Sequence, residues 1–354
     1  MRCRDPRPRN RKQTVKAKLQ SRSPLEIRTN LAEVIPLPSP ITMIVEVASV
    51  CNLRCTFCPT GDTEISRGTG KFRGLMDFAL FEKIIADIAR FDRPIKALHL
   101  HKDGEPLVHP QFPEMVKLAK SSPNILRVET TTNGILLAPD LNEKLAGSGI
   151  DRVKISVYGL SEQDFLKNSR VRVNFDRYIE NIADLYRRRR NTEIYVKIME
   201  EGLDNAKKQF FLDTFGDIAD TVFFEHCVDT WPEFSLQGRS EVAVKTIGIL
   251  GQPVRAYKKV CPQPFYNLTV CADGRMTACC ADWEVKLEVG DARSESLFDV
   301  WNSPRYDDFR RMMLRGERAT HPVCGRCGYP TMTCVDDIDD AAPKILENYN
   351  RKRP

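Results

Sequence analysis

Alternating strand and helix patterns over residues 43–224 constrain the fold of this 354-residue chain more than any other feature. Short runs, of which the first is apolar and rich in β-branched residues, are expected to be strands, and the segments with a helical pattern between them are expected to be helices. The expected strands are Met43–Val47, Ala97–Leu100, Leu126–Thr131, Val153–Val157, Ile194–Ile198 and Thr221–Phe224, and the expected helices are Met76–Ala89, Phe112–Ala119, Leu141–Ala146, Phe175–Arg189 and Asp204–Phe215. This alternation predicts an α/β fold, a partial (β/α)6 TIM-like barrel, with its chemistry at the carboxyl ends of the strands.

The remaining sequence divides by composition. The expected organisation is a basic arm at 1–40, the partial barrel at 41–230, a linker at 231–260, a small cysteine-rich module at 261–340 and a tail at 341–354. Residues 1–28 hold ten Lys or Arg against two acidic residues, although the whole chain carries only +6. We therefore expect a disordered arm and a nearly neutral body, which disfavours nucleic acid as a partner. No apolar run approaches the roughly 18 residues of a membrane span, so we expect no membrane association.

Three cysteines on one short loop are the strongest chemical signal. Cys51, Cys55 and Cys58 follow the first expected strand in the spacing Cx3Cx2C. Such a compact loop can bring three thiolates to three irons of a 4Fe–4S cube and leave the fourth iron without a protein ligand. A structural zinc site needs a fourth ligand close by, and the nearest histidines, His99 and His101, lie two segments away. The spacing therefore favours a cluster with one open iron.

These cysteines, with the aromatic Phe57 before the third, resemble the motif of the radical S-adenosylmethionine (SAM) superfamily. The resemblance covers about residues 40–230. It rests further on Asp103-Gly104-Glu105-Pro106, Thr132-Asn133-Gly134, Ser156 and Arg170, with Arg172 as the alternative to Arg170.

The resemblance assigns roles to these residues in binding SAM. It implies that Gly104 and Glu105 belong to the turn that meets the SAM amino group. Asn133 is in the position of the family's turn beneath the adenosine, and Ser156 is in that of its serine on the fourth strand. The arginine, Arg170 or Arg172, would bind the SAM carboxylate. Asp103 stands where the family carries a glycine, which leaves close backbone approach to Gly104.

The C-terminal module carries a second set of cysteines. Two pairs supply four thiolates, which would suit a zinc ribbon or an iron–sulfur cluster. The pattern resembles the auxiliary-cluster module of radical SAM enzymes, called SPASM in its full form and twitch in its shorter form. It implies one auxiliary 4Fe–4S cluster held by Cys261, Cys279, Cys324 and Cys327. Cys280 could replace Cys279, because spacing does not separate adjacent cysteines, and only Cys334 follows, at the wrong interval for a second auxiliary cluster.

The resemblance also implies a reaction. SAM on the open iron is cleaved to a 5′-deoxyadenosyl radical, which abstracts hydrogen from a substrate C–H bond. An architecture with a single auxiliary cluster resembles radical SAM dehydrogenases of aminocyclitols and sugars, so we expect oxidation or epimerisation of a carbohydrate-type alcohol carbon. Cys227 follows the sixth expected strand, where its thiol could return hydrogen to a substrate radical, as an epimerase requires.

Two other functions stay open at the level of sequence. One is peptide maturation, although only about 40 residues precede the expected barrel, fewer than a peptide-recognition domain needs. The other is a non-catalytic iron–sulfur electron-transfer or scaffold protein. For the expected enzyme, the partners are a carbohydrate-type small molecule and an electron donor such as flavodoxin or ferredoxin. We expect a cytoplasmic location, because a cluster with an open iron is vulnerable to oxidants.

Overall fold

The computed structural model describes residues 16–21, 28–231, 234–236, 238, 246–254 and 257–351. Within them, strands join in one sheet in the order β1-β7-β6-β5-β4-β3-β2-β8-β9-β10. The strands are β1 (Lys18–Leu19), β2 (Thr42–Val45), β3 (Ala97–His99), β4 (Val128–Thr132), β5 (Arg152–Val157), β6 (Glu193–Met199), β7 (Thr221–Glu225), β8 (Asn267–Val270), β9 (Arg275–Thr277) and β10 (Glu288–Asp291). The helices are α1 (Leu31–Val34), α2 (Thr63–Gly68), α3 (Phe78–Ile88), α4 (Phe112–Ser121), α5 (Pro139–Ala146), α6 (Glu162–Ser169), α7 (Phe175–Arg188), α8 (Asn205–Phe215), α9 (Gln263–Tyr266), α10 (Leu297–Trp301), α11 (Pro304–Leu314), α12 (Tyr329–Met332) and α13 (Ala342–Arg351).

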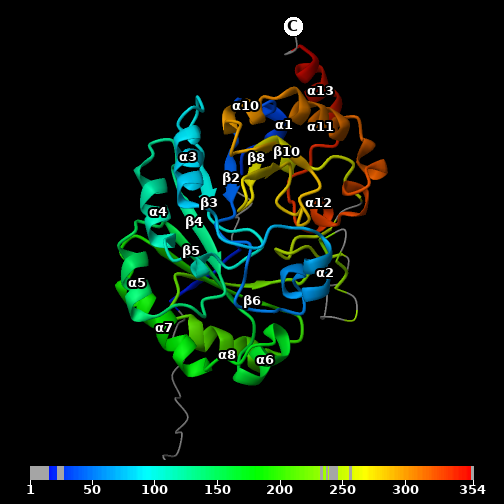
Figure 1. Ribbon diagram of the computed structural model, residues 1–354. Coiled ribbons are helices and arrows are strands. Elements are labelled where there is room, and N and C mark those ends of the chain that lie inside the picture. The colour runs from blue at the N-terminus through cyan, green and yellow to red at the C-terminus, as the bar shows by residue number, and fades with distance from the viewer. Residues whose placement is uncertain are drawn as a thin grey trace, which may run out of the picture.

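The expected partial barrel is confirmed. All six expected strands are present as β2 to β7, and each pairs in parallel with the next one along the chain. Helices α3, α4, α5, α7 and α8 cover the outside of these strands (Figure 1). The sheet stays open, because β1 follows β7 at one end and β8 follows β2 at the other.

Several barrel helices begin where a side chain accepts a hydrogen bond from one of their first backbone N–H groups. Asp77 accepts a hydrogen bond from the N–H of Ala79 at the start of α3, and Asn174 accepts one from the N–H of Arg177 at the start of α7. Their apolar faces then pack on the strands, with Phe81 and Ile182 fully buried. Local capping and a single apolar stripe together explain why these segments are helical.

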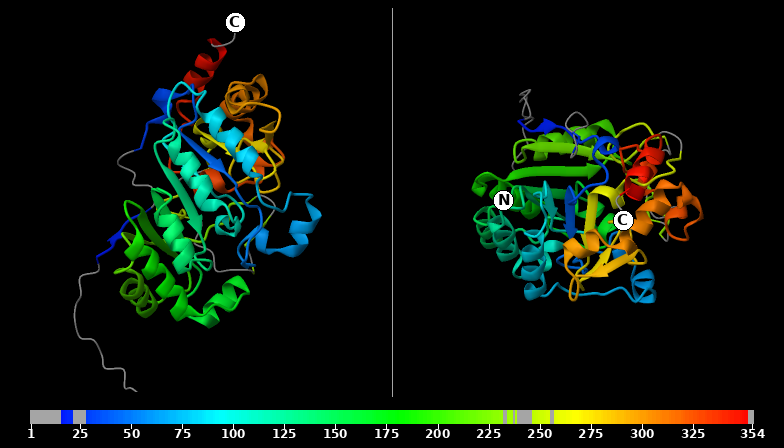
Figure 2. Two further views of the ribbon diagram at one scale, coloured as in Figure 1. Left: turned by 60° about the vertical axis from the view of Figure 1, so that its left-hand side comes forward. Right: turned by 90° about the horizontal axis from the view of Figure 1, so that it is seen from above.

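The C-terminal module continues the barrel sheet. β8 pairs in parallel with β2, and Met43 lies opposite Leu268 in the register. β9 and β10 then extend the sheet in antiparallel fashion. Figure 2 shows these strands beside β2, with α10 and α11 around them. One hydrophobic core includes both Val45 of the barrel and Trp301 of the module, so the two parts pack as one body.

Part of the expected basic arm at 1–40 lies outside the described residues. In its described part, Lys18–Leu19 pairs with β7 and Leu31–Val34 is helical, with Leu31 buried in the core, so these segments differ from the expected disorder. The expected tail at 341–354 contains α13, which buries Ile345 and Tyr349. Part of the expected linker at 231–260 also lies outside the described residues. Within the described part of the chain, no helix has the length and apolar character needed to cross a bilayer.

Candidate functional site

A cavity of about 400 Å³ lies at the carboxyl ends of the barrel strands. It brings together most of the expected barrel residues, since its lining includes Cys51, Cys55, Cys58, Gly104, Glu105, Asn133, Ser156 and Cys227. Cys280 and Tyr329 of the C-terminal module also line it. The cavity is therefore bounded by both parts of the chain.

The loop after β2 holds three thiols against this cavity. Gly61 lets the chain fold tightly behind the loop, because a Cβ there would come within 2.5 Å of the Cys55 carbonyl oxygen. Burial raises the pKa of Cys51 to about 12, and burial together with the neighbouring thiols raises that of Cys55 well above its usual value. Three such thiols do not ionise together without a positive centre beside them.

The donor set fits an iron–sulfur cube better than a single ion. Cys51, Cys55 and Cys58 line one wall of the cavity, beside open space. Among the residues that the structure describes, no three His, Cys, Asp or Glu side chains converge on a point that one metal ion could occupy. A cube spreads its three thiolate ligands over three irons, so this arrangement suits it.

Glu105 joins two of the expected SAM-binding turns. Its carboxylate accepts hydrogen bonds from the Thr132 hydroxyl at 2.6 Å, the Asn133 N–H at 2.7 Å and the Leu107 N–H at 3.0 Å. The Asn133 side-chain amide in turn reaches the sulfur of Cys51 at 3.9 Å. Burial raises the pKa of Glu105 to about 7. A carboxylate has about four acceptor sites, so Glu105 retains capacity for one more donor.

Gly104 is required by close packing at the start of the cysteine loop. A Cβ there would lie 2.2 Å from the Ala48 carbonyl oxygen and 2.6 Å from that of Val50. The Glu105 N–H donates to the same Val50 oxygen at 2.9 Å. Gly104 thus fixes this turn against the chain that leads into Cys51.

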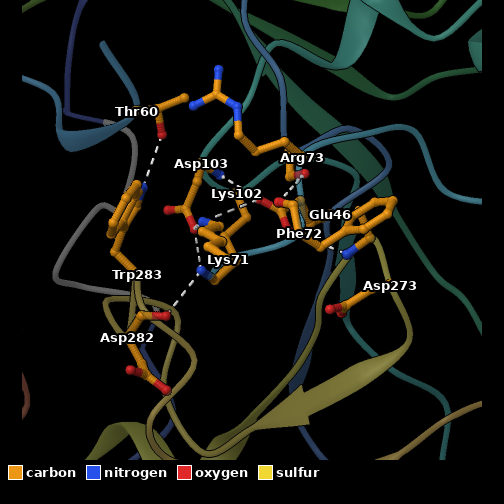
Figure 3. Close-up of polar contacts among 12 residues, drawn as sticks. Glu46, Thr60, Lys71, Phe72, Arg73, Lys102, Asp103, Asp273, Asp282 and Trp283 are labelled. Carbon is orange, nitrogen blue, oxygen red and sulfur yellow. Dashed lines mark hydrogen bonds and ion pairs between the residues drawn. The ribbon is translucent and has the colours of Figure 1, made fainter. Parts of the chain in front are cut away.

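Asp103, which replaces the family's glycine, anchors a buried ion network (Figure 3). Its carboxylate pairs with the ammonium groups of Lys71 and Lys102, and all three side chains are at most 7% exposed. Glu46 completes the network, 3.8 Å from Lys71 Nζ. The two cations lower the pKa of Asp103 despite its burial.

The same network fastens the barrel to the C-terminal module. Lys102 Nζ donates to the Asp282 carbonyl oxygen at 3.1 Å, and the Ala272 N–H donates to Glu46 at 3.2 Å. Trp283 Nε1 donates to the Thr60 hydroxyl at 2.9 Å, which ties the module to the segment after Cys58 (Figure 3). The turn expected to bind SAM and the C-terminal module are therefore positioned by shared polar contacts.

A further group of polar side chains on the cavity wall comes from β6 and β7. Lys197 and Glu225 form an ion pair there, and both are mostly buried. The Cys227 N–H donates to Glu201 at 2.7 Å, which holds this thiol on the wall. His101 adds a ring nitrogen, 3.2 Å from the Thr131 hydroxyl.

Sequence reasoning missed Lys197, Glu225 and His101. The alternation of side chains along a strand could have identified the two strand residues, because residues two apart on a strand share a face. Lys197 shares its face with Met199 on β6, and Glu225 is the last residue of β7, at the cavity edge of the sheet. A charged residue on the inner face of a barrel strand is costly unless it is paired, so it marks a candidate functional position.

The four cysteines expected to hold the auxiliary cluster line one small pocket in the module. Cys261, Cys279, Cys324 and Cys327 all border it. Burial raises the pKa of Cys324 to about 12 and that of Cys327 to about 11. The set again consists of neutral thiols that need a positive centre to ionise.

Cys280 contacts the Cys279 thiol but lines a different cavity. It lines the large cavity instead of the auxiliary pocket, and its thiol lies 3.3 Å from the Tyr329 hydroxyl. Hydrogen bonds with Cys279 and Tyr329 lower the pKa of Cys280 to about 7. This placement supports Cys279 as the ligand.

Arg170 is not brought to the cavity. It follows α6, a helix that sequence analysis did not anticipate, and adopts a left-handed conformation with φ 56° as its C-cap. Its N–H donates to the Leu166 carbonyl oxygen at 3.0 Å, and its side chain is exposed. Arg172 is exposed as well. Neither side chain lines the cavity, contrary to the expected carboxylate-binding role.

Family models match both parts of the chain. The model of the radical SAM superfamily matches residues 45–207. The model of the iron–sulfur cluster-binding domain called SPASM matches residues 261–328. The two matches cover the partial barrel and the cysteine-rich module respectively.

The chain is also similar to individual proteins, over part or most of its length. The GTP 3′,8-cyclase of Chlorobaculum tepidum is 36% identical over 127 residues, which are 36% of this chain and 35% of that protein. The S-adenosyl-L-methionine-dependent 2-deoxy-scyllo-inosamine dehydrogenase of Niallia circulans is 22% identical over 297 residues, 83% of this chain and 95% of that protein. The structure of BtrN with AdoMet and 2-DOIA has a TM-score of 0.53 at 19% identity, covering 84% of this chain and 96% of that one. Several curated matches are shorter, spanning between 30% and 49% of the relatives' lengths.

Proposed function

Because this chain belongs to the radical SAM superfamily and carries a C-terminal SPASM module, we propose that it oxidises a hydroxyl-bearing carbon of an aminocyclitol or related carbohydrate-type molecule to a ketone. The observation that carries the proposal is the cavity, which lies between the three barrel cysteines and Cys280 of the module. The substrate class is supported by similarity to a 2-deoxy-scyllo-inosamine dehydrogenase along 95% of that protein.

The cofactors follow from the two domains, and their positions are part of the proposal. Cys51, Cys55 and Cys58 would hold a 4Fe–4S cluster that, with SAM bound, would supply a 5′-deoxyadenosyl radical able to take a hydrogen atom from the substrate. The four thiols of the auxiliary pocket would hold a second 4Fe–4S cluster. With four protein ligands, that cluster would supply a one-electron acceptor and not a substrate-binding site.

Residues of this chain orient SAM and the cluster. Glu105 offers its remaining acceptor site to the SAM amino group, and Asn133 fixes the carboxylate of Glu105 and contacts Cys51. Gly104 keeps this turn close to the loop that carries the cysteines. Ser156 lines the same cavity and completes the expected set on β5.

Oxidation of an alcohol carbon also releases the hydroxyl proton. We assign its acceptance to a carboxylate oxygen of Glu225, which lines the cavity and is paired with Lys197. A general base placed in this way accelerates a reaction by about 10²–10⁴-fold.

Cys227 supports the epimerisation alternative. Its thiol lies on the cavity wall, two residues beyond Glu225, as the expected hydrogen donor requires. Epimerisation would return a hydrogen atom from Cys227 to the substrate carbon, whereas oxidation leaves a ketone. Normal turnover by a Cys227→Ala variant would end this alternative.

The remaining partners belong to the same proposal. A one-electron donor of the flavodoxin or ferredoxin type reduces the cluster that binds SAM. A reducing cytoplasm preserves a cluster with an open iron.

The experiment is anaerobic turnover of the reconstituted, dithionite-reduced protein with SAM and 2-deoxy-scyllo-inosamine. We expect 5′-deoxyadenosine and a ketone in equal amounts. A triple variant with Ala at Cys51, Cys55 and Cys58 is the control and should form neither product. Cleavage of SAM without ketone from any aminocyclitol or sugar tested would contradict the proposed substrate class.

A further inference from the structure

The auxiliary pocket has a buried cation on its wall. Arg318 is 0% exposed and lines the pocket together with the four cysteines. Its guanidinium donates only to backbone carbonyl oxygens: Nη1 to Cys324 at 2.8 Å and Cys327 at 3.3 Å, and Nε and Nη2 to Lys258 at 3.1 and 2.7 Å. These four bonds use four of the five N–H donors, and none of them is to an anion.

Carboxylates do not neutralise this cation. Asp282 also lines the pocket, but it accepts hydrogen bonds from the Thr277 hydroxyl at 2.6 Å and from the N–H groups of Lys286 and Leu287 at 3.0 and 2.8 Å. Within the described ranges of the chain, Arg318 makes no ion pair with Asp or Glu. On its outer side the guanidinium lies 4.2 Å from the ring centre of Tyr257.

A second cation lies on the adjoining segment. Lys258 is buried, and its ammonium donates to the carbonyl oxygens of Cys334 and Asp336, both at 2.7 Å. The carbonyl oxygen of Lys258 is the one that accepts two of the bonds from Arg318. Among the described residues, two buried cations that form no ion pair therefore adjoin one side of the module.

A buried charge without a partner costs several kcal/mol, so this arrangement calls for an anion close to Arg318. A 4Fe–4S cluster with four thiolate ligands is such an anion, and its negative charge increases by one on reduction. A fixed positive charge beside it stabilises the reduced form more than the oxidised form.

We propose that Arg318 is the counter-cation of the auxiliary cluster and raises its reduction potential, which makes the cluster a better acceptor of one electron. The proposal rests on the assignment of Cys261, Cys279, Cys324 and Cys327 as ligands. Arg318 acts here as a positioning residue: it holds the backbone of two ligands and supplies charge, without touching the substrate.

The test is an anaerobic redox titration of the auxiliary cluster, followed by electron paramagnetic resonance in the full reconstituted chain without SAM or substrate. Arg318→Met removes the charge and keeps the length of the side chain, whereas Arg318→Lys keeps the charge. We expect Arg318→Met to lower the equilibrium constant for reduction at least about tenfold, or about 59 mV for one electron. Arg318→Lys should recover most of this shift.

Arg315→Met is the matched control. Arg315 lies three residues away, but it is exposed and pairs with Glu317 in solvent, where its charge is screened. Its loss should leave the potential unchanged.

Three results would overturn the proposal. The first is an unchanged potential in an Arg318→Met protein with full iron content. The second is an equal shift in Arg315→Met. The third is loss of the cluster from both Arg318 variants, because the charge-preserving variant would then fail for a reason other than charge. None of these readouts uses turnover, so they are independent of the proposed oxidation.

Discussion

Cys279 and Cys280 are neighbours in sequence but line different cavities: Cys279 borders the auxiliary pocket, and Cys280 borders the cavity that contains Cys51. We therefore expect Cys279→Ala to remove the auxiliary cluster and Cys280→Ala to retain it. Iron analysis after anaerobic reconstitution should give about four irons per chain for Cys279→Ala. It should give about eight for Cys280→Ala and for the wild type. The reverse pattern would make Cys280 the ligand.

Substitution of Glu225 should reduce ketone formation much more than hydrogen abstraction. Glu225→Gln keeps the shape of the side chain but removes its ability to accept a proton. We expect ketone formation to fall about 10²-fold or more, because general-base catalysis contributes about 10²–10⁴-fold. Cleavage of SAM should fall much less, since Glu105 and the cysteine loop remain intact.

The measurement is the ratio of ketone to 5′-deoxyadenosine in single-turnover reactions. Glu317→Gln, an exposed carboxylate paired with Arg315 in the module, is the control and should keep the ratio near one. Equal loss of both products in Glu225→Gln would mean that Glu225 serves SAM binding instead of proton transfer.

Glu105 should make stability depend on pH. Burial raises the pKa of this acid from 4.5 to about 7 in the folded chain. When folding raises the pKa of an acid, the protonated acid stabilises the folded chain. This stabilisation is fully present below the pKa of the acid in the unfolded chain, and it is lost as the pH rises through the pKa in the folded chain. We therefore compare the reconstituted wild type and Glu105→Gln, both without SAM. Between pH 5 and pH 8, the free energy of unfolding of the wild type should fall by about 2 kcal/mol relative to that of the variant.

Denaturant unfolding of both proteins at the two pH values measures this difference. If the difference in free energy of unfolding between the two proteins were the same at both pH values, Glu105 would titrate with an ordinary pKa. A gap that changes in the opposite direction would require a carboxylate that is stabilised in its charged form.

Asp103 should be a structural requirement of this chain even though the family carries a glycine at its position. Asp103→Asn leaves the buried ammonium groups of Lys71 and Lys102 without a full counter-charge. Breaking a buried ion pair by removing one partner costs about 3–5 kcal/mol, whereas an exposed pair contributes about 0–1 kcal/mol. In equilibrium unfolding, Asp103→Asn should lose about 3–5 kcal/mol of the free energy of unfolding, and Glu317→Gln about 0–1 kcal/mol. Equal losses in the two variants would contradict this role of Asp103.

The sequence predicted the barrel well because its information is local. Each of β2 to β7 arises from a short local run of residues, and helices such as α3 and α7 arise from an apolar stripe with its own cap. The Cx3Cx2C spacing likewise confines Cys51, Cys55 and Cys58 to one loop, so their meeting required no knowledge of the rest of the fold.

Features that depend on contacts between distant segments were not predictable in this way. The pairing of β8 with β2 joins residues more than 220 positions apart, and α13 is held by the core of the module. Lys197 and Glu225 become a pair only when β6 and β7 lie side by side. The exposed position of Arg170 was not predictable either, because this residue is the C-cap of α6, a helix that the sequence analysis did not identify.

The central claim is that three thiols on the loop after β2 hold a 4Fe–4S cube with one iron open to SAM. It is tested most directly in a variant with Ala at Cys324 and Cys327, in which only the barrel cluster remains. We expect about four irons, and an electron paramagnetic resonance signal of the reduced cluster that changes when SAM is added, because SAM becomes a ligand of the open iron. A signal that SAM leaves unaltered, or bound zinc in place of iron, would contradict the claim.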